Sequence, residues 1–199
     1  MKSIYLTNSS FYLGNDVAGV ARSLLGKVLL TRSSGKVTSG IIVETEAYSY
    51  REKGCHAYNG RITARNEVMF KQGGHAYVYL CYGIHHLFNV VTNVEGKADA
   101  VLIRALEPIE GVELMKHRMK VKAETRLTSG PGKLTRALAI DRSLNGASLV
   151  KNKVWLEDQG QQIRLSEILS TARIGIDYAG PDAFLPWRFT LKDNPWISK

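Results

Sequence analysis

The chain has 199 residues, 44% of them hydrophobic, and a formal net charge of +9 at pH 7. This length and hydrophobic content predict one domain with a well-filled core. No apolar run approaches the length that crosses a bilayer, and the first residues, MKSIYLTNSS, lack the apolar segment of a signal peptide. We therefore expect a soluble, unexported protein whose positive charge favours a polyanionic partner such as a nucleic acid.

The first predicted element is a short amphipathic helix over residues 16–26, capped by Asn15 or Asp16 and closed by Gly26. Residues 27–31 and 39–48 then predict two strands joined by a turn at residues 33–36.

Residues 51–74 are polar, basic and rich in glycine, and they show no sustained period. They predict a long loop, and long loops in compact domains are often functional.

Two β-runs within residues 75–91 are hinged at Tyr82-Gly83, which predicts a hairpin. Residues 98–108 predict a further strand that Pro108 ends, and residues 109–119 predict a basic helix. A Gly/Pro turn leads into another short helix within residues 128–140. The remaining expected strands are residues 154–157, 172–176 and 188–191.

Neither the cysteines nor the histidines form a recognisable metal or disulfide pattern. Cys55 and Cys81 lie in no CxxC motif and are expected to be reduced thiols without a functional role. No HExxH or mixed Cys/His spacing occurs among the five histidines. We therefore expect no metal site.

The stretch GIIVETEAYSY, residues 40–50, places carboxylates in an apolar strand. Period-2 geometry puts Glu44, Glu46 and Tyr48 on one face. The commonest setting for such a pattern is an edge strand with a solvated outer face. Arg104 argues against that setting, because it sits in the apolar run VLIRAL and needs an anionic partner there. That partner is either one of the two glutamates or a ligand phosphate, and residue patterns alone leave both open.

Two further stretches suit nucleic-acid contacts. A large ring at the end of a projecting hairpin, here Tyr82, can wedge into a base stack, although it can also fold back onto the sheet. In SGPGKL, residues 129–134, the backbone at Gly130 and Gly132 and the side chain of Lys133 can contact phosphates, although the stretch can equally be an ordinary turn.

Several motifs occur in a fixed order that is similar to a known family: VETEAY, His56, RNEVMF, YVYLCYG, Asn89, LIRALEP, SGPGKL and NPWIS. In this order they resemble the alkyladenine (3-methyladenine) DNA glycosylases, the mammalian-type enzymes that also occur in bacteria. The resemblance implies an α+β fold in a single mixed domain, residues 1–199, with a curved antiparallel sheet, surrounding helices and a β-hairpin that inserts into DNA. It also implies a bacterial protein of the cytoplasm, associated with the nucleoid.

The resemblance further implies a role for each matching residue. Glu46 is the general base, Arg104 helps to position the attacking water, and the backbone carbonyl of Ile174 is a further contact of that water. The remaining matches are the residues around the flipped base, Tyr48, His56, Tyr79 and Asn89, and the intercalating residue, Tyr82.

The expected activity is that of a monofunctional DNA glycosylase that releases 3-methyladenine, with hypoxanthine and ethenoadenine as further candidates. No cofactor is implied, and the expected partner is double-stranded DNA with damaged purines, bound by a monomer. Two other classes stay open: a non-catalytic binder of damaged DNA, which would have no use for Glu46, and a single-stranded RNA-binding module.

Overall fold

The fold is organised around β3 (Lys36–Tyr48) in the computed structural model, which describes residues 4–5, 9–124, 126–150 and 152–198. One edge of β3 pairs with β6 (Asp99–Glu110). The other edge pairs first with β2 (Val28–Ser33) and then, from Glu44 to Glu46, with β9 (Arg188–Leu191). β3 is therefore a central strand and not an edge strand, which explains why its glutamates are buried.

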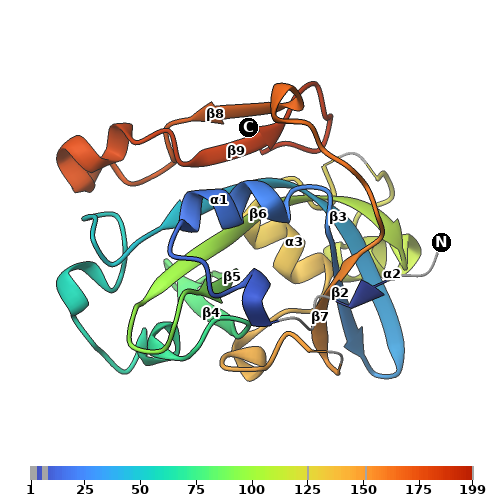
Figure 1. Ribbon diagram of the computed structural model, residues 1–199. Helices are drawn as coiled ribbons and strands as arrows, with labels where there is room; N and C mark the ends of the chain where they lie inside the picture. The colour runs from blue at the N-terminus through green and yellow to red at the C-terminus, as the bar shows by residue number, and fades with distance from the viewer. Residues whose placement is uncertain (1–3, 6–8, 125, 151, 199) are drawn as a thin grey trace.

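The remaining strands extend this sheet on both sides, and all pairings among the described residues are antiparallel (Figure 1). Beyond β2 lie β7 (Val154–Asp158) and then β1 (Ile4–Tyr5). Beyond β6 lie β5 (His85–Thr92) and then β4 (Ala76–Cys81). The last strand, β8 (Ile168–Thr171), pairs with β9. The predicted α+β class with an antiparallel sheet is confirmed.

Three α-helices cover the sheet. α1 (Val17–Leu24) packs against β3 and β6, and the Asp16 carboxylate caps it by accepting a 2.9 Å hydrogen bond from the Gly19 amide. α3 (Pro131–Ala137) packs against β5 and β6, and α2 (Val112–Met119) packs against α3. Apolar side chains of these helices and of the sheet form one continuous core. Among the described helices, none has the length and apolar character that crossing a membrane requires.

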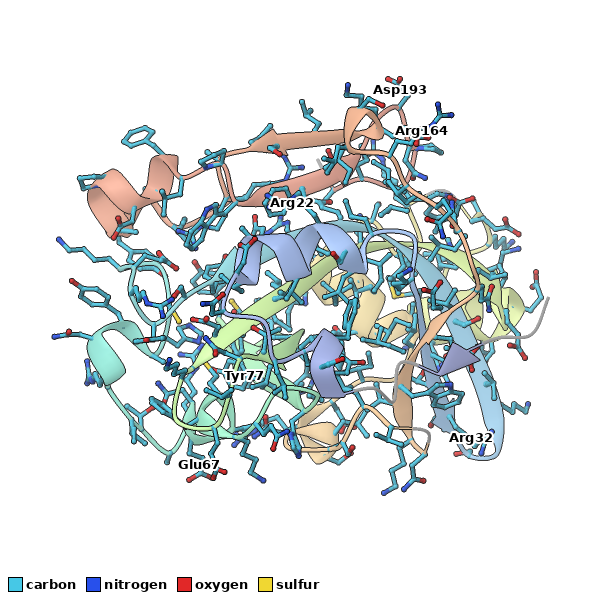
Figure 2. The ribbon with its side chains drawn as sticks, viewed as in Figure 1. Arg22, Arg32, Glu67, Tyr77, Arg164 and Asp193 are labelled. Atoms are coloured by element: carbon cyan, nitrogen blue, oxygen red, sulfur yellow. The ribbon has the colours of Figure 1, made fainter. Side chains whose placement is uncertain are left out.

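The C-terminal hairpin β8–β9 lies across α1, as Figure 1 shows. Arg22 of α1 reaches toward this hairpin in Figure 2, and its guanidinium lies 5.0 Å from the centre of the Phe189 ring. A segment of 3-10 helix, η6 (Asp177–Phe184), kinked at Gly180, connects the two strands. This hairpin brings residues from far along the chain to the edge of β3, where the glutamates lie.

The hairpin β4–β5 pairs from Ala76↔Val90 to Cys81↔His85. The Ile84 amide donates to the Cys81 carbonyl at 3.1 Å, and both residues between them have positive φ angles, 49° at Tyr82 and 72° at Gly83. This is the geometry of a type I′ turn, which favours Asn or Gly at both positions. A tyrosine in this conformation is strained, and such strain is frequently found at functional sites.

The other predicted elements were right in kind with one exception, and two of the predicted bounds were wrong. Residues 172–176 are not a strand, because the side chain of Arg173 turns into the interior and the Ile174 amide donates to a side chain instead of a neighbouring strand. Pro108 does not end its strand, since β6 continues to Glu110 with Pro108 opposite Gly40. The basic helix consequently begins at Val112, not at residue 109.

The remaining elements are short 3-10 helices, two of which interrupt the long loop predicted at residues 51–74. They are η1 (Ser9–Phe11), η2 (Tyr58–Gly60), η3 (Glu67–Phe70), η4 (Arg142–Leu144) and η5 (Leu165–Glu167).

Candidate active site

A cavity of about 710 Å³ opens between the β4–β5 hairpin, the loop after β3, the segment at residues 174–178 and the beginning of α3. Its volume falls within the range of small-molecule sites. Nearly all of the predicted site residues line it: Tyr48, His56, Tyr79, Tyr82, Asn89, Arg104, Gly130, Gly132, Lys133 and Ile174. The folded chain thus gathers residues that are up to 126 positions apart in the sequence around one space.

Glu46 lies directly behind the wall of this cavity. Its side chain is fully buried, and its two oxygens accept hydrogen bonds from three groups that line the cavity. The Tyr48 hydroxyl donates to Oε2 at 2.8 Å, Nη1 of Arg104 donates to Oε2 at 3.3 Å, and the Ile174 amide donates to Oε1 at 2.8 Å. The carboxylate is therefore held in one orientation from three sides.

Glu44 is buried too, and two of its three partner residues, Arg188 and Ser198, come from the C-terminal part of the chain. Its Oε1 accepts from Nε of Arg104 at 3.0 Å, from Nε of Arg188 at 2.7 Å and from the Ser198 hydroxyl at 2.8 Å. Its Oε2 accepts from the Ser198 amide at 2.7 Å. All four bonds tie strands and chain end together, which gives Glu44 the surroundings of a structural residue.

Arg104 bridges the two carboxylates, which answers the question of its anionic partner. Burial by itself lowers the pKa of the guanidinium, but the charges of Glu46 and Glu44 outweigh burial and raise the pKa above its ordinary value. With Arg188, the cluster contains two positive and two negative side chains. This balance makes the burial of four charges tolerable.

A β-bulge sets the direction of these side chains. The register between β3 and β6 shifts on both sides of Glu44. Because a bulge re-aims side chains locally, Glu44 and Glu46 need not share the environment that strict alternation predicts.

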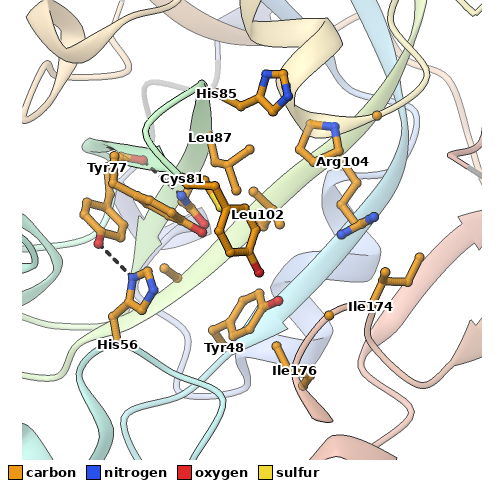
Figure 3. Close-up of a pocket in the computed structure, with 18 of the residues that line it drawn as sticks. Tyr48, His56, Tyr77, Cys81, His85, Leu87, Leu102, Arg104, Ile174 and Ile176 are labelled. Carbon is orange, nitrogen blue, oxygen red and sulfur yellow. Dashed lines mark hydrogen bonds between the residues drawn. The ribbon is translucent and has the colours of Figure 1, made fainter. Parts of the chain in front are cut away.

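Aromatic rings form the walls of the cavity. Figure 3 shows Tyr48 on one side and His56 with Tyr77 on the other. The His56 and Tyr79 rings meet edge-to-face with centroids 4.7 Å apart, and Nδ1 of His56 is hydrogen-bonded to the Tyr77 hydroxyl at 2.9 Å. Burial, and secondarily the charge of Arg65, lowers the pKa of His56 to about 4, so the imidazole is neutral at pH 7.

Burial and the nearby Glu46 carboxylate raise the pKa of Tyr48 well above its ordinary value. Its hydroxyl therefore stays protonated and remains a donor to Glu46.

Tyr82 stands at the tip of the hairpin and is 89% exposed, so its ring does not fold back onto the sheet.

Asn89 lies on the floor of the cavity, where its side-chain amide donates to the Tyr77 carbonyl at 3.1 Å. Gly132 packs so closely on His85 that a Cβ would lie 2.8 Å from the imidazole ring. The phosphate contacts expected of Gly130, Gly132 and Lys133 stay predictions, as do the roles of the other predicted site residues.

Comparison with known proteins fits this arrangement. Residues 10–195 match the family described as Methylpurine-DNA glycosylase (MPG). The chain belongs to this family. A protein of Carboxydothermus hydrogenoformans is 49% identical over 188 residues, which cover 94% of this chain and 96% of the relative. A protein of Natranaerobius thermophilus is 44% identical, with the same coverage, and one of Methanocella arvoryzae is 49% identical over 90% of both chains. Each carries the name "Putative 3-methyladenine DNA glycosylase".

In this member of the methylpurine-DNA glycosylase family, the surroundings of the cavity include residues that sequence reasoning missed. Arg173 and Glu52 form a buried ion pair behind Tyr48, although the sequence singled out only the neighbouring Ile174. Tyr178 lines the cavity mouth and donates from its hydroxyl to the Gly54 carbonyl at 3.2 Å. No spacing signal marks these residues, because their partners lie more than 120 positions away.

The other titratable groups of this methylpurine-DNA glycosylase family member are arranged without a metal-binding pattern. Among the described residues, no three His, Cys, Asp or Glu side chains gather as a metal site would require. Burial raises the pKa of Cys55 to about 12, so this thiol stays protonated.

Proposed function

We propose that this chain, residues 1–199, acts as one DNA glycosylase domain that hydrolyses the N-glycosidic bond of alkylated or deaminated purines in duplex DNA. The observation that carries the proposal is the position of Glu46, a buried carboxylate held by three donors directly behind an aromatic cavity. Membership of the methylpurine-DNA glycosylase family and the names of the relatives support the same activity. The substrate set is 3-methyladenine, with hypoxanthine and ethenoadenine as further members.

The target base must leave the duplex before water can reach its glycosidic carbon, and this costs a few kcal/mol. The exposed, strained Tyr82 suits this step, because a ring at the tip of a hairpin can fill the gap that the base leaves. The flipped base then stacks between Tyr48 and the His56–Tyr79 pair. Stacking contributes about 1–3 kcal/mol per base, and a cationic alkylated purine gains cation–π attraction as well.

Hydrolysis then requires a water near the glycosidic carbon and a base to take its proton. The Glu46 carboxylate accepts that proton and also stabilises the positive charge that develops on the sugar as the bond breaks. Arg104 and the Ile174 carbonyl hold the water, together with a phosphate of the bound DNA. The placement of both residues on the cavity wall beside Glu46 supports these roles.

The proposed partner is double-stranded DNA with a damaged purine, bound by a monomer. The net charge of +9 favours a polyanion, and the DNA backbone is contacted by Lys133 and by the main chain at Gly130 and Gly132. The proposed place of action is the bacterial nucleoid.

The deciding experiment measures base release from duplexes that each carry one methylated or deaminated adenine, under single-turnover, metal-free conditions. We expect the wild type to release the base. Glu46→Gln is expected to lower the rate constant by roughly 10²–10⁴-fold, the usual contribution of a general base, while it still binds the lesion. Glu67→Gln is the matched control, because it makes the same chemical change at an exposed position (Figure 2).

Two outcomes would contradict the proposal. A wild type that binds the lesion but releases no base across the panel would indicate the non-catalytic binder. A covalent adduct trapped with borohydride would contradict the monofunctional mechanism, since it requires a Schiff base between a lysine and the DNA sugar.

A further inference from the structure

Arg173 and Glu52 form an ion pair that does not line the cavity. The Arg173 side chain is fully buried, and its two Nη atoms donate to the two Glu52 oxygens at 2.7 and 2.8 Å. The same atoms also donate to the Ala47 carbonyl at 2.8 Å and to the Asp182 carbonyl at 3.0 Å. The guanidinium therefore fastens together the end of β3, the loop that follows it and the η6 segment.

The pair reaches Glu46 by a first route through Tyr48. The guanidinium carbon lies 4.7 Å from the centre of the Tyr48 ring and 5.4 Å from that of Trp187. Since Tyr48 lines the cavity and Arg173 does not, Arg173 lies against the face of the ring that is turned away from the cavity. This contact fixes the ring whose hydroxyl donates to Oε2 of Glu46.

A second route runs through the main chain. Ile174 follows Arg173 directly, and its amide donates to Oε1 of Glu46 at 2.8 Å. Because the Arg173 side chain is anchored to the Ala47 carbonyl, next to Glu46 in β3, the Ile174 amide is held at a fixed distance from the carboxylate. Each oxygen of Glu46 thus depends on one of the two routes.

The hydrogen bonds of the Arg173 guanidinium indicate that this residue does more than join the three segments. Nε of Arg173 is buried without a hydrogen-bond partner among the described residues, so the guanidinium gives up one bond where it stacks on Tyr48. Buried donors left without a partner are rare and call for an explanation.

We propose that Arg173, held by Glu52, is a positioning residue that sets the orientation of Tyr48 and of the Ile174 amide, and through them the orientation of the Glu46 carboxylate. This inference rests on the proposed function, because it assigns to the pair a share in the base-release reaction. It gives Arg173 no contact with the damaged base or with the attacking water.

The surroundings of Glu46 determine how a change in this pair would appear in the pH dependence. The charged and titratable groups facing Glu46 are Tyr48 and Glu44 on its own strand, Arg104 on β6, Arg188 opposite it on β9, and Arg173. A carboxylate that loses O–H or N–H donors binds a proton more readily. A disturbed pair therefore moves the acid limb of the rate profile to higher pH.

The test compares Arg173→Lys with wild type in single-turnover base release over a range of pH, together with equilibrium binding of the lesion duplex. Lysine keeps the charge but cannot bind Glu52 through two parallel donors or stack as a plane. We expect a rate constant at least tenfold lower, an acid limb at higher pH and a dissociation constant within about twofold of wild type. Arg118→Lys is the matched control, because Arg118 is a half-buried arginine bonded to Thr38 and Ala137, outside the cavity wall.

A folded Arg173→Lys with the wild-type rate constant and pH profile would overturn the inference, as would equal losses in binding and rate. If this variant does not fold, Glu52→Asp replaces it, since it keeps the charge and withdraws the carboxylate from Arg173. The same pH shift is expected there, and an unchanged profile counts against the inference. Absence of base release by the wild type in the same assay would instead refute the proposed function.

Discussion

Replacing each of the two glutamates of the VETEAY stretch by glutamine is expected to have different effects: one replacement chiefly lowers stability, and the other chiefly lowers activity. Glu44→Gln should destabilise the fold, because Glu44 accepts four hydrogen bonds and is the carboxylate partner of Arg188. Glu46→Gln should stop base release at a smaller cost in stability, because Glu46 accepts three hydrogen bonds, only one of them from an arginine, whereas two of the four that Glu44 accepts come from arginines.

The loss of stability expected for Glu44→Gln follows from the hydrogen-bond partners of each Glu44 oxygen. A glutamine can keep its carbonyl oxygen at the position of Oε1, but its NH₂ group then faces the buried Ser198 amide, which loses its acceptor. An unsatisfied buried donor costs about 1–3 kcal/mol, and the two arginine bonds weaken because the acceptor is no longer charged. The total is about 3–5 kcal/mol, the usual cost of breaking a buried ion pair.

For a chain of this length, that loss lowers the melting temperature by about 6–20 °C. Thermal unfolding followed by circular dichroism measures it, with Glu46→Gln and wild type in the same buffer. Equal melting temperatures for Glu44→Gln and wild type would refute the reasoning, and so would a Glu46→Gln variant as unstable as Glu44→Gln.

Three further results are expected. Tyr82→Ala should lower single-turnover base release more than nonspecific DNA binding, and equal losses in both would contradict the wedge. The logarithm of the DNA association constant should fall steeply and linearly with that of salt concentration, because Lys and Arg contacts release counterions; a flat response would contradict the role of the basic surface. Because His56 has a pKa of about 4 in the fold and about 6.5 when unfolded, stability should decline as pH falls from 6.5 to 4, by up to about 3 kcal/mol. His56→Asn should lose this slope in thermal unfolding, and an unchanged slope would assign it to other groups.

Much of the candidate site follows from local patterns in the sequence. A charge inside VLIRAL needs a partner, which predicts that Arg104 meets an anion, and Glu44 and Glu46 are that anion. The Tyr82-Gly83 pair predicts a hairpin turn, and the turn is found there with both φ angles positive.

The rest depends on distant partners that no local pattern reveals. The alternation of Ala172, Ile174 and Ile176 imitates a strand, yet Glu52 draws Arg173 into the interior and prevents one. The different surroundings of Glu44 and Glu46 likewise depend on Arg188 and Ser198. Both residues lie far along the chain, and both donate hydrogen bonds to Glu44.

The bond between Glu44 and Ser198 also orders events during synthesis. The two residues are 154 positions apart, so at about 5–20 residues per second Glu44 emerges roughly 8–30 s before its partner. Until then β9 is missing from the edge of β3, and Arg188 and Ser198 cannot neutralise and cover the buried charge. The nascent chain therefore holds Glu44 and Arg104 before all of their hydrogen-bond partners exist, and this cluster closes only after translation has passed residue 198.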